Sequence, residues 1–384
     1  MGATITLGVS GWRLKAERTG VRRYLFNLIS RWTPEMVQSR FSGVTVYSPR
    51  ATQRGETAFP PGIGERVLRS ELAMIPWENL RVGPVARESV MLYPSYSRPL
   101  VARGATVVVT HDATMRLYPE LFTKRDRRVY DPLYGWSARA ATLVITTTYA
   151  ARADISAQWG VDPSKIHVTH LAADESFGPL PLSTDRNALR LRLTGFDEPY
   201  FLFAGKISGR RNLPRLLDAL AEFRRSSSHP HRLVMVGPPQ ATRELELMAE
   251  NLGIRQHVVT RGFASDVELN QLYNCADAFV MPSTYETVSF PIMEAQAAGT
   301  PVICVDTPGS REMTGGEAVL IPRLDVRDLV AAMASIASDS AFRASIAERG
   351  MANCRRFSWA RCAAETLDIC AEAGRMSGVS NRRP

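Results

Sequence analysis

Residues 278–305, which read AFVMPSTYETVSFPIMEAQAAGTPVICV, contain the pattern that decides the fold of this chain. Two short apolar runs, 278–281 and 301–305, flank a stretch with helical character that ends at Gly299. Glycine often ends a helix because it adopts the left-handed conformation without strain. Runs that are apolar at every position are typical of parallel strands covered on both faces. The stretch therefore predicts a strand, a helix and a second strand parallel to the first.

The same alternation extends along the whole chain. The further apolar runs are 5–9, 44–47, 90–93, 106–110 and 143–146 in the first part, and 200–204, 232–236, 257–260 and 318–321 in the second. A single open sheet of so many strands would be unusually wide, so two doubly wound, Rossmann-like domains are the more economical arrangement. The predicted fold class is therefore α/β, with two such domains facing across a cleft.

Glycine and proline mark the predicted domain boundary. Gly178, Pro179, Pro181 and Pro199 surround a short charged segment, and such clusters are typical of connecting loops. We predict a first domain over 1–178, a linker over 179–199, a second domain over 200–356, a helix over 357–372 and a disordered tail over 373–384.

Composition limits the function. The 384 residues carry a net charge of +9 and five cysteines, and they show neither an apolar stretch long enough to span a bilayer nor a secretory leader. We therefore expect a cytoplasmic protein with reduced thiols. The positive charge favours anionic partners such as nucleotide phosphates or an anionic membrane surface, although a generally basic surface explains it equally well.

The opening stretch contains two glutamates near its predicted helix. Glu286 precedes the helix and Glu294 lies within it. The backbone N–H groups at a helix start suit a diphosphate, and carboxylates accept hydrogen bonds from sugar and ribose hydroxyls. The alternative is that both are solvated charges. The candidate donor-binding residues at the helix start are Thr287, Val288, Ser289 and Phe290.

A second candidate loop follows the run 200–204. Lys206, Arg210 and Arg211 are three cations within six residues, and cations there would stabilise the charge of a leaving diphosphate without a metal ion. A solvated basic loop is the alternative.

The first domain offers weaker candidates. His111 and Asp112 directly follow a buried run, where an imidazole could contact a sugar or transfer a proton; a structural histidine is the plain alternative. Gly20 opens a predicted helix after the first strand, where it could be an ordinary turn or could direct backbone amides toward a ligand.

Taken together, these segments resemble the retaining GT-B glycosyltransferase family with the EX7E motif, which is also called group 1 or family 4, and within it the mannosyltransferase-like branch. The resemblance rests on Glu286 and Glu294 with Pro282 and Gly299, on the basic loop, on His111-Asp112 and on Phe357-Ser-Trp359. Thr287 and Ser289 stand where the family usually has glycine.

The resemblance implies a role for each residue. Glu286 would contact the transferred sugar and Glu294 the ribose, while Lys206 and Arg211, with Arg210 beside them, would bind the diphosphate. His111 would face the sugar, Gly20 would lie in a loop that meets the donor, and the C-terminal helix would cross back to the N-terminal domain.

The expected function is transfer of a hexose, with retention, from a nucleotide-diphosphate sugar to a glycan or lipid-linked acceptor in polysaccharide or glycolipid assembly. The resemblance favours GDP-mannose as the donor. We expect no metal, no cofactor other than the donor substrate and no nucleic-acid partner, and a peripheral position on an anionic membrane is a further expectation. The alternatives are a nucleotide-sugar epimerase of similar fold and an inactive, polyanion-binding relative.

Overall fold

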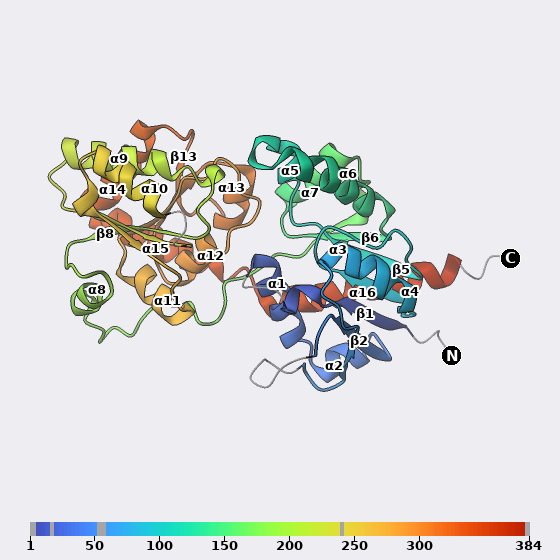
Figure 1. Cartoon of the computed structure of the whole chain (residues 1–384). Helices are drawn as coiled ribbons and strands as arrows, with labels where there is room; N and C mark the ends of the chain where they lie inside the picture. Colours follow the sequence, from blue (N-terminus) through green and yellow to red (C-terminus); the bar gives the residue numbers. More distant parts are fainter. Residues whose placement is uncertain (1–4, 16–18, 52–58, 239–241, 381–384) are drawn as a thin grey trace. The chain divides into compact units, whose positions relative to one another are not determined.

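The computed structural model describes residues 5–15, 19–51, 59–238 and 242–380. The chain divides into two compact units: the first comprises Met1–Leu171 and Ser358–Pro384, and the second comprises Ala172–Phe357. Each unit contains one parallel sheet with helices on both faces (Figure 1). The α/β fold with two Rossmann-like domains is therefore confirmed.

The first unit has a seven-stranded sheet in the order β3-β2-β1-β4-β5-β6-β7. All of its strand pairs are parallel. Its strands are β1 (Thr6–Ser10), β2 (Gly43–Ser48), β3 (Ile63–Val67), β4 (Val90–Tyr93), β5 (Ala105–Val109), β6 (Leu143–Thr146) and β7 (Ile166–Val168). The strand order reverses direction between β1 and β4, and ligands of open α/β sheets bind at the carboxyl ends of strands at such a switch point.

Helices cover both faces of this sheet. Trp77, Ala138 and Ile155 pack a helical layer onto one face, while α16 contacts β4, β5 and β6 from the other face together with α1. The helical segments are η1 (Trp12–Lys15), α1 (Gly20–Ser30), α2 (Pro34–Gln38), α3 (Met74–Trp77), η2 (Glu78–Val82), α4 (Gly83–Val85), α5 (Thr114–Leu117), η3 (Pro119–Leu121), α6 (Lys124–Ala140), α7 (Tyr149–Trp159), η4 (Pro163–Lys165) and α16 (Trp359–Ser380).

The second unit has a six-stranded sheet in the order β10-β9-β8-β11-β12-β13. It is also parallel throughout, and its switch point lies between β8 and β11. Its strands are β8 (Tyr200–Ala204), β9 (Arg232–Val236), β10 (Val258–Arg261), β11 (Ala278–Met281), β12 (Val302–Val305) and β13 (Val319–Ile321). The four central strands are buried almost throughout and form the centre of the core.

In Figure 1, α9, α10 and α14 lie on one side of this sheet, and α11, α12 and α15 lie on the other. The helical segments are α8 (Arg186–Thr194), η5 (Gly209–Arg211), α9 (Leu213–Ser226), α10 (Thr242–Asn251), η7 (Arg255–His257), α11 (Asp266–Cys275), α12 (Phe290–Ala297), α13 (Pro308–Thr314), α14 (Val326–Ser338) and α15 (Ser340–Cys354). Among the described residues, no helix combines the length and the apolar character that crossing a bilayer requires.

The segment predicted as a linker, 179–199, belongs to the second unit instead, and the boundary of that unit lies at Ala172. Within the segment, α8 packs on α11. The backbone N–H of Leu180 donates to the side-chain oxygen of Asn274 at 2.9 Å, and Leu189 and Phe196 are buried in the core. The prediction was wrong because proline and glycine indicated a break in regular structure, whereas scattered apolar residues dock the segment.

The predicted tail was also wrong over its first part. The helix that follows Phe357 continues to Ser380, and Ala373 is fully buried. A Cβ at Gly374 would lie 2.8 Å from the side chain of Ile5, so small residues are required where this helix crosses the first sheet. Residues 381–384 lie outside the described part. The crossing of this helix to the N-terminal unit is confirmed.

Candidate functional site

The candidate donor-binding residues meet at the switch point of the second sheet. The carboxyl ends of β8 and β11 lie next to each other because the two strands pair in parallel. The basic loop follows β8 and the Glu286 loop follows β11. The two loops are joined directly, because the N–H of Thr284 donates to the carbonyl of Arg210 at 3.3 Å.

Glu286 and Arg211 form a buried ion pair. Their Oε1 and Nη1 atoms are 2.9 Å apart, and the two residues are only 3% and 7% exposed. Arg210 approaches the other carboxylate oxygen at 3.5 Å. Burial lowers the pKa of Arg211, and the carboxylate of Glu286 opposes that effect. The structure therefore brings together three residues that the sequence assigned to two separate loops.

This pair keeps unused hydrogen-bonding capacity. Within the described residues, neither carboxylate oxygen of Glu286 nor Nε of Arg211 has a hydrogen-bond partner of good geometry. Buried polar atoms are usually hydrogen-bonded, and exceptions require an explanation. One donor and two acceptors without good partners at a switch point suit a ligand that carries both anionic oxygens and hydroxyl groups.

The backbone of the basic loop has an unusual conformation at each end. Gly205 has φ of +136° and Asn212 has φ of 49°. Glycine adopts positive φ without steric cost, and asparagine tolerates it better than most residues. The side chain of Asn212 donates to the carbonyl of Arg210 at 3.1 Å, which fixes the turn that carries both arginines. Lys206 lies exposed on the same loop.

The start of α12 differs in detail from the expected cradle of free N–H groups. The helix begins at Phe290 with Ser289 as its N-cap. The N–H of Ser289 contacts the sulfur of Met313 at 2.8 Å, so this amide already has a partner. Thr287 and Ser289 are buried, and the Ser289 hydroxyl has no hydrogen-bond partner among the described residues. Val288 is half-buried between them.

Glu294 is buried inside the same unit and is 2% exposed. Its Oε2 accepts a hydrogen bond from the hydroxyl of Tyr273 at 3.1 Å. The Tyr273 carbonyl in turn accepts from the Thr300 hydroxyl at 2.7 Å. Glu294 is therefore held in a fixed position by α11, which is the kind of support that a recognition carboxylate requires.

Gly309 contacts the candidate site, and the sequence analysis did not identify it. It lies in the first turn of α13, and a Cβ there would come within 1.9 Å of the backbone carbonyl oxygen of Glu286. Only glycine allows this close approach of two backbones. Thr307 and Ser310, on either side of Gly309 in the chain, form a reciprocal cap that fixes the helix start. The signal in the sequence was the Thr-Pro-Gly-Ser segment after a strand, which is typical of a capped helix start.

The predicted residues of the first unit also gather near its switch point. His111 follows β5 and is 8% exposed, and its Nε2 lies 3.2 Å from the carbonyl of Pro94. Its ring contacts that of Tyr24 edge-on at 5.3 Å. Tyr24 belongs to α1, the helix that begins at Gly20 and is capped by Thr19. His111 and the Gly20 helix are therefore in contact through one tyrosine.

The chemistry available to His111 follows from its surroundings. Burial lowers the pKa of His111, so the neutral imidazole is the form present at neutral pH. A hydrogen bond to the Pro94 carbonyl requires the proton on Nε2, which leaves Nδ1 as an acceptor. Asp112 accepts from the N–H of Thr114 at 2.9 Å and so orders the following loop.

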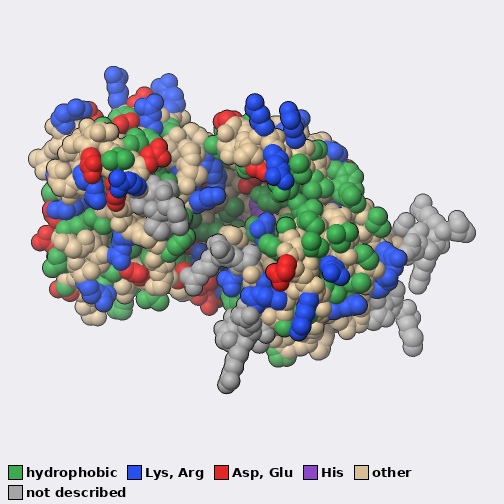
Figure 2. Space-filling view, in the orientation of Figure 1, with side chains coloured by type: hydrophobic (Ala, Val, Ile, Leu, Met, Phe, Trp, Pro, Cys, Tyr) green, Lys and Arg blue, Asp and Glu red, His purple; other side chains and the backbone are tan. Residues whose placement is uncertain are grey.

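Other parts of the molecule add little to this site. Within the described ranges, His, Cys, Asp and Glu side chains form no group of three or more that could hold a metal ion. Figure 2 shows Lys and Arg side chains scattered over the displayed face with Asp and Glu among them. The net charge of +9 is therefore not gathered into one patch on that face.

Comparison with known proteins finds similarity to group 1 glycosyltransferases over part of this chain. Residues 192–352 match the family described as glycosyl transferases group 1. The D-inositol 3-phosphate glycosyltransferase of Xylanimonas cellulosilytica is 31% identical over 256 residues, which are 64% of this chain and 59% of that protein. The O-antigen chain mannosyltransferase B of Escherichia coli is 25% identical over 263 residues, covering 68% and 69% of the two chains. The alignment with the first relative thus spans about three fifths of its length.

Solved structures resemble the whole fold. WaaG, a glycosyltransferase involved in lipopolysaccharide biosynthesis, superposes with a TM-score of 0.70 at 18% identity, covering 95% of this chain and 99% of its own. Anabaena HepE, solved in complex with UDP and glucose, gives a TM-score of 0.70 at 19% identity, covering 99% and 100%. At such low identity these likenesses show the GT-B fold alone.

Proposed function

We propose that this chain is a retaining, metal-independent glycosyltransferase that moves a hexose from a nucleotide-diphosphate sugar to a glycan or lipid-linked acceptor. The observation that carries the proposal is the buried Glu286–Arg211 pair with Arg210 beside it at the β8–β11 switch point. The match of residues 192–352 to the group 1 family supports the same reading. Mannose is the favoured sugar, and GDP-mannose the favoured donor, in line with the mannosyltransferase among the relatives.

The proposed chemistry divides between the two carboxylates and the basic loop. Lys206 and Arg211 stabilise the negative charge that develops on the leaving diphosphate, because the Nε–H of Arg211 is available while its Nη1 holds Glu286. Glu286 accepts hydrogen bonds from hydroxyls of the transferred sugar, and Glu294 recognises the ribose.

The proposed course of transfer is attack on the same face from which the diphosphate leaves. The bond from the anomeric carbon to the phosphate oxygen breaks as the acceptor oxygen bonds to that carbon. The acceptor hydroxyl proton passes to the departing phosphate oxygen, which needs no protein base. His111 contributes an acceptor atom, Nδ1, for a hydroxyl of the transferred sugar.

Donor binding tests the proposal directly. Thermal unfolding would be followed with GDP-mannose, UDP-glucose, UDP-N-acetylglucosamine and the parent nucleotides, each in the presence of EDTA. We expect one nucleotide family to raise the unfolding temperature in EDTA, because ligand that binds only the folded state stabilises it. We expect Glu294→Gln to weaken the stabilisation by every nucleotide, because each carries the ribose that Glu294 is proposed to bind. We expect Glu286→Gln to abolish the difference between a nucleotide sugar and its parent nucleotide.

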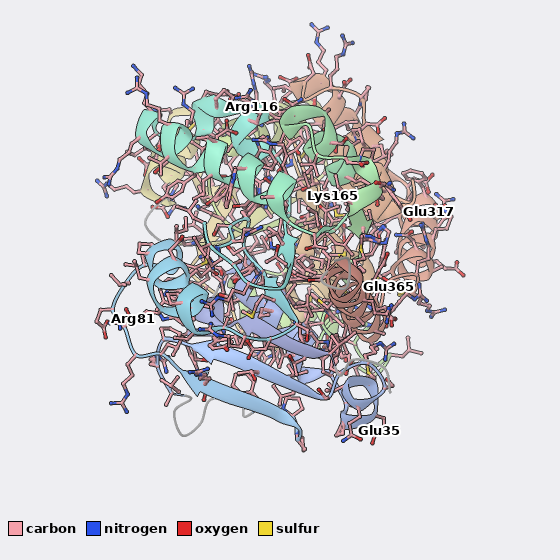
Figure 3. The ribbon with its side chains drawn as sticks, turned by 90° about the vertical axis from the view of Figure 1, so that its right-hand side faces the viewer. Glu35, Arg81, Arg116, Lys165, Glu317 and Glu365 are labelled. Carbon is pink, nitrogen blue, oxygen red and sulfur yellow. The ribbon has the colours of Figure 1, made fainter. Side chains whose placement is uncertain are left out.

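A matched control keeps the comparison fair. Glu317, labelled in Figure 3, is a carboxylate of the same unit that pairs with Arg349 at 2.7 Å. Glu317→Gln should leave every nucleotide response unchanged. No response to any nucleotide in the wild-type protein would contradict the proposal, and release of an epimerised sugar without an acceptor would favour an epimerase.

Membrane association is proposed separately, from the first unit. Helix α6 exposes Lys124, Arg125 and Arg128, and the neighbouring Val129 is 51% exposed. Cations and an apolar side chain on one helix surface suit an anionic bilayer surface. Flotation with anionic and with neutral vesicles at low salt tests this; the protein should float only with the anionic ones, and sedimentation with both would contradict the proposal.

A further inference from the structure

A short turn after β4 has a strained backbone. The N–H of Ser97 donates to the carbonyl of Ser95 at 2.7 Å, which closes a three-residue turn around Tyr96. Tyr96 has φ of 62°, so this is the γ-turn of positive φ, the rarer and more strained form. Such strain persists only where surrounding contacts impose it, and it gathers at functional sites. One of these contacts is the N–H of Tyr96, which donates to the carbonyl of Val109 at 2.8 Å.

The side chains of Arg13 and Glu78 hold the two ends of this turn. Nε of Arg13 donates to the hydroxyl of Ser95 at 3.1 Å. The hydroxyl of Ser97 donates to Oε2 of Glu78 at 3.3 Å. Arg13 comes directly after β1, and the turn comes directly after β4. Both contacts therefore lie at the switch point of the first sheet, where ligands of such sheets bind.

Glu78 is the central residue of this arrangement. It is 1% exposed, and its Oε1 accepts from the hydroxyl of Ser10, the last residue of β1, at 2.6 Å. It opens the π-helix η2, whose position is marked in Figure 3 by the label of Arg81. π-helical turns are rare and occur frequently at functional sites. One carboxyl group thus links the ends of the two strands that border the switch point.

The turn also determines the surroundings of His111. The ring of Tyr96 contacts the imidazole edge-on at 5.5 Å. The residue just before the turn, Pro94, provides the carbonyl that lies 3.2 Å from Nε2 of His111. A shift of the turn would therefore move both neighbours of the imidazole on this side.

We infer that Glu78 is a positioning residue that, by joining Ser10 to Ser97, holds the strained turn against which His111 is oriented. The inference rests on the proposed function, in which His111 contacts the transferred sugar. Glu78 itself touches no substrate in this role. Its effect on the reaction passes through Tyr96 and Pro94.

The charge state of Glu78 makes the role measurable. Burial raises the pKa of this carboxyl to about 8, while the two serine hydroxyls and the Arg13 guanidinium oppose the rise. Among the described residues, Tyr93 of β4 and Tyr134 of α6 also interact electrostatically with it. Above that pH a buried negative charge replaces the neutral carboxyl and disturbs the turn that orients His111. The plot of kcat against pH should therefore fall on its alkaline side, with a midpoint near this pKa.

The test is nucleotide release from GDP-mannose and UDP-glucose by the full chain, measured against pH. Glu78→Gln keeps a neutral hydrogen-bonding group, so we expect kcat at pH 7 within about threefold of wild type and no alkaline limb. Glu78→Leu removes both hydrogen bonds, so kcat should fall more than about tenfold while KM for the donor changes less than about threefold. Ser97→Ala, a milder change, should lower kcat about fivefold in the same way.

A matched control is Glu88→Gln. Glu88 accepts hydrogen bonds from the Tyr47 hydroxyl at 2.8 and 2.9 Å, but it precedes β4 in the chain, whereas the turn 95–97 follows that strand. It should keep the wild-type kcat and the alkaline limb. Wild-type kcat in folded Glu78→Leu and Ser97→Ala, or an unchanged alkaline limb in Glu78→Gln, would overturn the role of Glu78 alone. Absence of nucleotide release and of nucleotide binding in the wild-type protein would overturn the proposed function as well.

Discussion

The carboxylate of Glu286 and the guanidinium of Arg211 have both lost nearly all contact with water. Removing two charges from water costs free energy that their mutual attraction offsets only when their geometry is good. A buried ion pair of this kind therefore contributes little net stability to the fold. At a switch point it is better explained by the chemistry of a ligand, because each partner keeps hydrogen-bonding atoms unused.

Removing one member of this pair should therefore be costly. Glu286→Gln leaves the buried guanidinium of Arg211 without its counter-ion, so we expect the free energy of unfolding to fall by about 3 kcal/mol. Transfer activity should fall at least about a hundredfold, as for loss of one preorganised group in an active site. Chemical denaturation and nucleotide release measure the two effects, and unchanged stability would show that Arg211 is adequately hydrated without Glu286.

Glu78 gives stability a dependence on pH with a definite sign. Its carboxyl ionises near 4.5 in an unfolded chain and near 8 in the folded one. Between these values the folded state holds one more proton, so the contribution of Glu78 to stability, complete below 4.5, is lost as pH rises toward 8. The unfolding temperature of the wild-type protein should therefore fall over this pH range, and that of Glu78→Gln should fall less. Parallel curves for the two proteins would contradict the prediction.

At the scale of elements, the site depends on how closely α13 approaches the loop after β11. The contact is between backbones, since Gly309 faces the Glu286 carbonyl with no room for a methyl group. The capping residues Thr307 and Ser310 fix the first turn of α13, so the start of this helix resists displacement away from Glu286. The position of the Glu286 carboxylate is thus set by a helix that follows the next strand.

Gly309→Ala tests this contact. The added Cβ must displace either α13 or the Glu286 backbone, so we expect a loss of about 1–3 kcal/mol of stability, typical of overpacking. Nucleotide binding should weaken in step, because the carboxylate moves with its backbone. Gly262→Ala is the matched control, since a Cβ there meets nothing within 4 Å. Equal stability and nucleotide affinity for both variants would show that the loop moves aside freely.

At the scale of the whole molecule, the chain leaves the first unit after Leu171 and returns to it at Ser358. The returning helix, α16, is tied to that unit by a hydrogen bond from the Trp32 ring to the Ala363 carbonyl. Arg40 also pairs with both carboxylate oxygens of Asp368, at 2.6 and 3.0 Å. The first unit is therefore complete only when the C-terminal helix has been added.

Two units with separate cores should unfold separately. We expect calorimetry to show two transitions, because cooperative unfolding is a property of each core. The donor nucleotide should raise the transition of the second unit more strongly, since the proposed phosphate- and ribose-binding residues all lie there. Gly374→Val, which places a side chain against Ile5, should lower only the transition temperature of the first unit. This change identifies which transition belongs to that unit. A single transition shifted by both changes would contradict this division.

The amino-acid sequence by itself predicted the buried strands, because strands covered on both faces are apolar at every position. It failed for β3 and β7, which lie at the two edges of the first sheet. In β3 the exposed and half-buried residues alternate, and β7 is only three residues long, so neither forms a continuous apolar run. The sequence also predicted the two candidate-site loops of the second unit, because charged residues directly after an apolar run can be recognised locally.

Only the tertiary structure decided which of these residues meet. Glu286 and Arg211 are distant in the sequence, and their pairing follows from β8 and β11 being neighbours in the sheet. The contact of Gly309, the link from Glu78 to Ser10 and Ser97, and the docking of α8 have the same origin. Local patterns report what a residue prefers, whereas the burial and the partner of a charge depend on elements that approach it from elsewhere in the chain.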